Sequence, residues 1–128
     1  MNLLNYLNNG FNYEQYITRV EDDLENEIEN DDPNEHVQYY ALSLQRMKRI
    51  TKTLKISPVL ENRIKASQSN FKLLTITEGW CGDASQILPV VEKLANTLKI
   101  ESKYILRDEN LDLMENYKTN KNYYLIAA

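Results

Sequence analysis

The first part of the chain repeats apolar residues with the period of an α-helix. Asn12 is a residue type favoured at helix N-caps, and Gln15 follows at the spacing of a capping box. A first helix is therefore predicted to begin after Asn12. Its apolar stripe consists of Tyr13, Tyr16, Ile17, Val20, Leu24 and Ile28.

A second helix is predicted to begin at Pro33, with Asp32 as its N-cap and Glu35 closing a capping box, and to end before Pro58. Its buried positions are predicted to be Val37, Tyr40, Leu44, Met47, Thr51 and Leu54. Ser57 and Pro58 begin a short third helix that runs to about Lys65. We therefore expect residues 1–65 to be helical throughout.

The pattern changes after this point. The polar residues 67–70 predict a loop, and the β-branched, largely apolar segment Phe71–Thr77 predicts a strand. A helix over Ala84–Leu98 and a second strand over Ser102–Leu106 follow. The helix is expected to bury Ile87, Leu88, Val91, Leu94, Ala95 and Leu98. A strand, a helix and a strand in this order predict a βαβ unit with parallel strands.

Two further elements are predicted near the C-terminus. Asp108 or Asn110 can cap a short helix over Leu111–Tyr117, and Tyr123–Ala127 is apolar enough for one more strand. The order of elements predicts the α/β class behind a helical segment.

Composition and charge narrow the possible functions. The 128 residues suffice for one ordinary domain, and 42% hydrophobic with 27% charged residues is typical of a soluble globular protein. The net charge of −4 argues against binding to nucleic acid or to an anionic membrane surface. No apolar run approaches a membrane span, no signal peptide is visible, and the single Cys81 fits a reducing compartment. A cytoplasmic location is expected.

Trp80, Cys81, Gly82 and Asp83 lie where the first strand leads into the long helix. A thiol at a helix N-terminus faces unpaired backbone N–H groups and the positive end of the helix dipole, and both favour the nucleophilic thiolate. Gly82 is expected to allow a tight turn, whereas the negative charge of Asp83 opposes the thiolate. The sequence predicts a moderately activated thiol at Cys81 that Trp80 shields. The alternative is a buried cysteine that serves only as a small apolar residue.

The segment GWCGDASQILP resembles the active-site segment of the thioredoxin superfamily, and Trp80, Cys81, Gly82 and Pro89 match its spacing. The phrases EGWCGDA, ILP and LRDEN look like a group of bacterial thioredoxin-like proteins with a helical N-terminal extension, which LQRMKR fits. The closer resemblance covers residues 38–120, and its thioredoxin part covers residues 70–120. It implies an α/β fold with a helical extension over residues 1–66 and a partial thioredoxin-like domain over residues 67–128.

The chain departs from the family pattern in two places. Ala84 stands where the second, resolving cysteine would be, so a dithiol cycle is excluded and only monothiol exchange is left. A small thiol such as glutathione, or a thiol of a partner protein, would resolve the adduct. The family's cis-proline loop, C-terminal hairpin and last helix have no counterpart after Thr119. We therefore expect a truncated or frame-altered copy that is marginally stable, prone to aggregation or completed by a partner.

Two functional hypotheses follow. In the first, Cys81 is the catalytic thiol of a redox protein, and Trp80, Gly82 and Asp83 shape its surroundings. In the second, the chain is a non-catalytic thioredoxin-like binding module or an inactive fragment. No cofactor is predicted. No metal site is predicted either, because His36 is the one histidine of the sequence and has no second histidine to bind a metal with it. The sequence leaves the substrate, the redox partner and the oligomeric state open.

Overall fold

The computed structural model describes residues 2–30, 37–67, 70–119 and 123–124. At its centre two parallel strands, β1 (Leu73–Thr77) and β2 (Ser102–Leu106), are connected by the helix α5 (Gly82–Leu98). The strands pair from Leu73 opposite Ser102 to Thr77 opposite Leu106. The predicted βαβ unit with parallel strands is confirmed.

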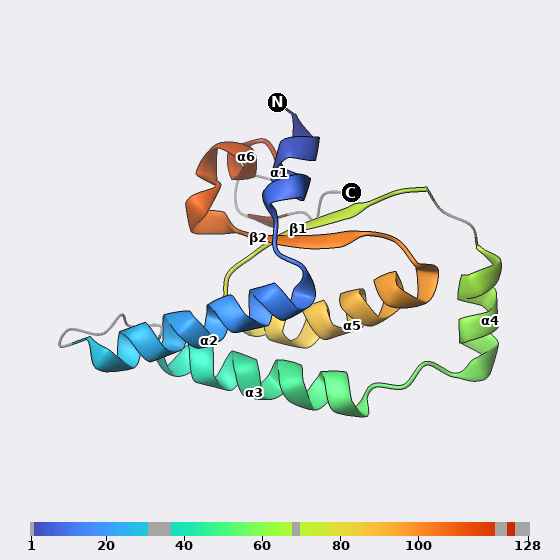
Figure 1. The fold of residues 1–128 in the computed structure, drawn as a ribbon, viewed down its shortest axis with the longest axis horizontal. Coiled ribbons are helices and arrows are strands. Elements are labelled where there is room, and N and C mark those ends of the chain that lie inside the picture. The colour runs from blue at the N-terminus through green and yellow to red at the C-terminus, as the bar shows by residue number, and fades with distance from the viewer. Residues whose placement is uncertain (1, 31–36, 68–69, 120–122, 125–128) are drawn as a thin grey trace.

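Helices cover both faces of this small sheet (Figure 1). α1 (Leu3–Asn9) and α6 (Leu111–Glu115) lie on one face. On the other face lie α5 and the two long helices α2 (Tyr13–Glu29) and α3 (Val37–Thr53). α4 (Pro58–Ala66) stands at one end of the molecule, on the path from α3 to β1.

The helix α2 begins with the predicted capping box. The Asn12 side chain accepts a hydrogen bond from the Gln15 N–H at 2.8 Å, and the Gln15 side chain accepts one from the Asn12 N–H at 2.9 Å. Tyr16 and Val20 are buried as expected. The predicted burial of Ile28 is wrong, since 68% of this residue is exposed. Ile28 belongs to the last turn of α2, and this end of α2 projects beyond the sheet (Figure 1).

The helix α3 buries Leu44 and Met47, as predicted, whereas Thr51 is exposed. Its predicted start at Pro33 lies outside the described residues. Ser57 caps α4 by accepting a hydrogen bond from the Leu60 N–H at 3.2 Å, which confirms the predicted start of that helix.

The sequence predicted a helical region over residues 1–65 but no separate helix before Asn12, so α1 is an addition within that region. It has seven residues, three of them asparagines, which are poor helix formers. Tertiary packing stabilises it, because Leu7 is 4% exposed in an apolar cluster with Leu74, Ile105 and Leu113. After α1, Phe11 pairs with Tyr104 through two backbone hydrogen bonds of 2.8 Å each, which occupies the outer edge of β2 at this point.

The βαβ unit differs in detail from its prediction. β1 begins at Leu73 instead of Phe71, and α5 begins at Gly82, two residues before Ala84. Leu88 and Ala95 of α5 are buried, but Ile87 is 49% and Leu94 is 36% exposed. Neighbouring helix positions point about 100° apart. The sheet and α3 therefore bury the stripe of Leu88 and Ala95 and leave the stripe of Ile87 and Leu94 outside.

The C-terminal part begins with a 3-10 turn, η1 (Arg107–Glu109), followed by α6, which Asn110 precedes as its N-cap. α6 ends at Glu115, two residues before the predicted Tyr117. The family's C-terminal hairpin was expected to be lacking. Here the structure describes a short antiparallel pair, β3 (Lys118–Thr119) with β4 (Tyr123–Tyr124), in a sheet separate from β1 and β2. The rest of the predicted last strand lies outside the described residues.

One apolar cluster joins the helical segment to the βαβ unit. Its buried members are Tyr16, Val20, Leu44, Met47, Leu88, Tyr104 and Leu106. Four of these residues come from α2 and α3 and three from the βαβ unit, so the long helices and the sheet share a core. Within the described residues, no helix is both long and apolar enough to cross a membrane.

Candidate functional site

Cys81 lies at the N-cap of α5, directly after the loop that leaves β1. The residue is partly exposed, and its side chain makes no capping hydrogen bond to the helix. Its backbone is well held, because the Cys81 N–H donates to the Glu78 carbonyl at 3.1 Å and its carbonyl accepts from the Ser85 N–H at 3.1 Å. The predicted placement of the thiol at a helix start is confirmed.

The glycine that the loop requires is Gly79. A Cβ atom at this position would lie 3.0 Å from Tyr40 Cε1 and 3.0 Å from Val20 Cγ2. The backbone of the loop therefore packs directly against side chains of α2 and α3, and this contact positions Trp80 and Cys81. Nothing in the sequence singles out Gly79, because only the tertiary structure brings two distant helices to this residue.

The expected role of Gly82 is wrong. No described glycine has a positive φ, and Gly82 is the first residue of α5 instead of a tight turn. A Cβ atom there would meet only Arg46 Nη1, at an ordinary contact distance of 3.6 Å. Asp83 follows in the exposed first turn of α5, where its negative charge interacts favourably with the positive end of the helix dipole.

Two guanidinium groups lie near the loop. Arg46 of α3 approaches Gly82, the first residue of α5. Arg107 of η1 lies over the ring of Trp80, with 5.6 Å between its guanidinium carbon and the ring centroid, and it pairs with Asp108 at 3.0 Å. Trp80 thus takes part in a cation–π contact that fastens the loop to η1.

Glu78 brings a carboxyl group into the interior at the start of the loop. The residue is 8% exposed, and its carboxylate accepts a hydrogen bond from the Asp108 N–H at 2.8 Å. Burial raises the pKa of Glu78, although this hydrogen bond opposes the shift. The Tyr16 hydroxyl donates to the Glu78 carbonyl at 3.4 Å, and burial raises the pKa of Tyr16, which is therefore a neutral phenol.

Ala84 occupies the first turn of α5, three residues after Cys81. It is partly buried and packs against the shared apolar cluster. The position therefore presents a methyl group to the core instead of a second thiol. Pro89 lies inside α5 and is buried.

A family model described as thioredoxin matches residues 30–124, a span that runs from before α3 to β4 and includes the whole Cys81 loop. The chain belongs to the thioredoxin family. No curated protein and no solved structure matched the chain. For this thioredoxin family member, the match supports the βαβ core and the helix that begins after Cys81.

The family match assigns no activity to individual residues, so the chemistry of the site depends on the residues themselves. Among the described residues, no three histidine, cysteine, aspartate or glutamate side chains are grouped to hold a metal ion. His36 lies outside the described part of the chain. The structure brings Trp80, Cys81, Gly82 and Asp83 together at one helix start and adds Gly79, Arg46 and Arg107, which sequence spacing could not connect with them.

Proposed function

We propose that Cys81 is the nucleophile of a monothiol thiol–disulfide exchange. The observation that carries the proposal is the partly exposed thiol at the N-cap of the 17-residue helix α5, without a capping bond of its own. The unpaired N–H groups and the positive end of the dipole of a helix N-terminus interact favourably with the negative charge on an attacking sulfur. A lone thiol of this kind stays reduced in a reducing compartment, so the proposal includes a cytoplasmic setting.

The reaction takes two exchange steps. In the first, the Cys81 thiolate attacks one sulfur of a substrate disulfide, a bond from Cys81 to that sulfur forms, and the other sulfur leaves as a thiolate. In the second, a thiol such as glutathione or a partner protein's cysteine attacks the mixed disulfide and releases the Cys81 thiolate. The attacking thiol of the second step forms a disulfide with the sulfur that Cys81 had taken up. One substrate sulfur has then been reduced to a thiol, the attacking thiol has been oxidised to a disulfide, and Cys81 is unchanged. Ala84 supplies no internal thiol, so the second step is intermolecular.

The surroundings of the loop would assist these steps in different ways. Arg46 brings positive charge to the residue after Cys81, which would attract an anionic small thiol such as glutathione. Trp80 directly precedes Cys81 in the chain, and its ring is held by the contact with Arg107. Asp83 brings a negative charge to the same turn and would repel an anionic small thiol.

The test compares the native chain with the same chain unfolded in urea, because both contain the single thiol of Cys81. We expect iodoacetamide to alkylate the native thiol faster at pH 7, since only the native chain has the helix. The native chain should also catalyse the reduction of hydroxyethyl disulfide by glutathione, and Cys81→Ser should abolish this turnover. A native thiol that reacts no faster than the unfolded one, together with no turnover, would contradict the proposal.

The second candidate is a non-catalytic thioredoxin-like binding module. Ala84 favours it, because the residue at the resolving position packs into the core. Under this hypothesis Cys81→Ser leaves every function of the protein unchanged. This candidate is supported if the native thiol is alkylated at the rate of the unfolded one and the chain does not turn over the disulfide substrate.

A further inference from the structure

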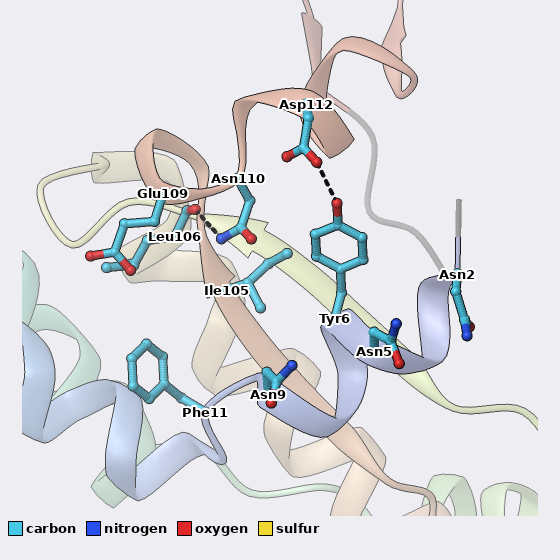
Figure 2. A pocket seen from close by; sticks show the side chains of 10 residues that line it. All are labelled: Asn2, Asn5, Tyr6, Asn9, Phe11, Ile105, Leu106, Glu109, Asn110 and Asp112. Atoms are coloured by element: carbon cyan, nitrogen blue, oxygen red, sulfur yellow. Dashed lines mark hydrogen bonds between the residues drawn. The ribbon is translucent and has the colours of Figure 1, made fainter.

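A concave site separate from the Cys81 loop lies on the face of the sheet that α1 and α6 cover (Figure 2). It is a pocket of about 740 Å³ between α1, the end of β2 and the segment from η1 to α6. This volume falls within the range of sites that bind small organic molecules. No residue of the Cys81 loop lines it, so the pocket is separate from the proposed thiol chemistry.

The pocket is lined by carboxamide groups. Asn5 and Asn9 stand on successive turns of α1, and both line the pocket with exposed side chains. Asn110 lines it from the other side and donates to the Leu106 carbonyl at 2.8 Å, which orients its amide and leaves its oxygen as an acceptor. A carboxamide both donates and accepts hydrogen bonds without carrying charge.

Two carboxylates add acceptors, and each already has a cationic or hydroxyl partner. The Tyr6 hydroxyl donates to Asp112 at 2.5 Å, and this bond lowers the pKa of Asp112, which therefore stays ionised. Glu109 pairs with Arg19 at 2.5 Å. Among the described residues that line the pocket there is no lysine or arginine. An anionic ligand is thus disfavoured, and a cation would have to compete with Tyr6 and Arg19.

Apolar surface completes the lining. Figure 2 shows the ring of Phe11 at one end of the pocket, the ring of Tyr6 toward the other, and Ile105 of β2 between them. Aromatic rings bury the C–H faces of a ligand while its polar groups reach the surrounding donors and acceptors.

We propose that this pocket binds a neutral saccharide. A sugar ring combines hydroxyl groups, each of which donates and accepts, with C–H faces that pack on aromatic rings. Uncharged carboxamides on α1, acceptor carboxylates on α6 and η1, and the rings of Phe11 and Tyr6 match those two properties. Two of the three asparagines of α1, Asn5 and Asn9, thereby have a role in spite of their low helix propensity, because their side chains line the pocket.

The test is saturation-transfer NMR on the full chain with maltose, cellobiose, lactose and diacetylchitobiose as probes. We expect transfer to the ring protons of at least one of them. The double variant Asn5→Ala/Asn9→Ala should weaken its binding about tenfold or more, through the loss of two hydrogen-bonding groups. Asn8→Ala is the matched control, because Asn8 lies on the same helix but does not line the pocket.

Alanine favours a helix more than asparagine does, so α1 should persist in both variants, and thermal unfolding verifies this. The proposal is overturned if none of the sugars receives saturation, or if the double variant binds as tightly as Asn8→Ala. A response to spermidine or to an acetylated tetra-alanine amide, with none to the sugars, likewise overturns it in favour of a cation or peptide site. None of these outcomes bears on Cys81, because no disulfide substrate is present.

Discussion

The chemistry of the Cys81 loop is decided by single residues around it. Cys81 supplies the thiol, and Ala84 occupies the position of the family's second cysteine. Gly79 allows the loop to pack on Val20 and Tyr40. Glu78 lies buried beneath the same loop and is hydrogen bonded to η1. A change at Ala84 therefore tests the thiol chemistry of the site, and a change at Glu78 tests the stability of the fold around the loop.

Restoring a second thiol should turn monothiol exchange into dithiol exchange. Ala84→Cys places a cysteine three residues after Cys81, in the first turn of α5. We expect mild oxidation to form an internal disulfide and the reduction of insulin by dithiothreitol to accelerate. Free thiols are counted by alkylation and intact mass. Gln86→Cys, at an exposed position of α5, is the control and should retain two free thiols. Equal behaviour of the two variants would count against the geometry of the site.

Glu78 should make stability depend on pH. Burial raises the pKa of Glu78, so the folded chain holds this proton more tightly than the unfolded chain. The stability that this provides is fully present below the ordinary pKa of a glutamate, about 4.3, and is lost as the pH rises through the raised value. Glu78→Gln keeps an acceptor for the Asp108 N–H and removes the titration. The free energy of unfolding, measured with urea, should therefore fall less between pH 4 and pH 7 in the variant than in the native chain. The exposed Glu25→Gln is the control, and an unchanged pH dependence in Glu78→Gln would refute this prediction.

At the scale of elements, local signals and tertiary contacts stabilise different helices. α2 and α4 begin at side-chain caps that the sequence displays, at Asn12 and Ser57. α1 contains three asparagines and depends on the packing of Leu7 against the sheet. Cys81 precedes α5 without a side-chain cap, so the backbone at the site of the proposed chemistry is held mainly by its contacts with Glu78 and Ser85.

Removing the cap of α2 should lower the stability measurably. Asn12→Ala eliminates the hydrogen bond from the Gln15 N–H at 2.8 Å and breaks the capping box. We expect a loss of about 1 kcal/mol in the free energy of unfolding, measured by urea titration. Asn26→Ala, an exposed change within the same helix, should be neutral or slightly stabilising. Equal effects of the two changes would show that the cap is unimportant.

At the scale of the whole molecule, the long helices and the βαβ unit share one core. Met47 of α3 is 1% exposed and belongs to the same cluster as Leu88 of α5 and Tyr104 of β2. The fold of the site is thus coupled to helices far away in the sequence. The contact of Gly79 with α2 and α3 extends this coupling to the Cys81 loop itself.

A cavity in this core should weaken both parts together. Met47→Ala is expected to lower the free energy of unfolding by about 2–5 kcal/mol, as for other large-to-small changes of buried residues. Circular dichroism, which follows the helices, and the fluorescence of Trp80 in the loop should show one coincident transition. The exposed Gln45→Ala in the same helix is the control. Two separate transitions would mean that the helices and the βαβ unit fold independently.

The sequence by itself determined the elements whose signals are local. The caps at Asn12 and Ser57, the period of the helices and the β-branched run in β1 predicted their positions, and the WCG motif before Pro89 led to the thioredoxin family. These features depend on neighbours within a few residues, which a linear pattern records.

Only the tertiary structure decided what depends on distant neighbours. It formed α1 around Leu7, left Ile87 and Leu94 exposed, assigned the steric need for glycine to Gly79 instead of Gly82, and brought Arg46 to the start of α5. It also assembled the pocket from α1 and the segment after β2, which are about a hundred residues apart in the chain. Burial and close approach are properties of the packed chain, and hydrophobic periodicity specifies only which face can be buried, not how much of it is.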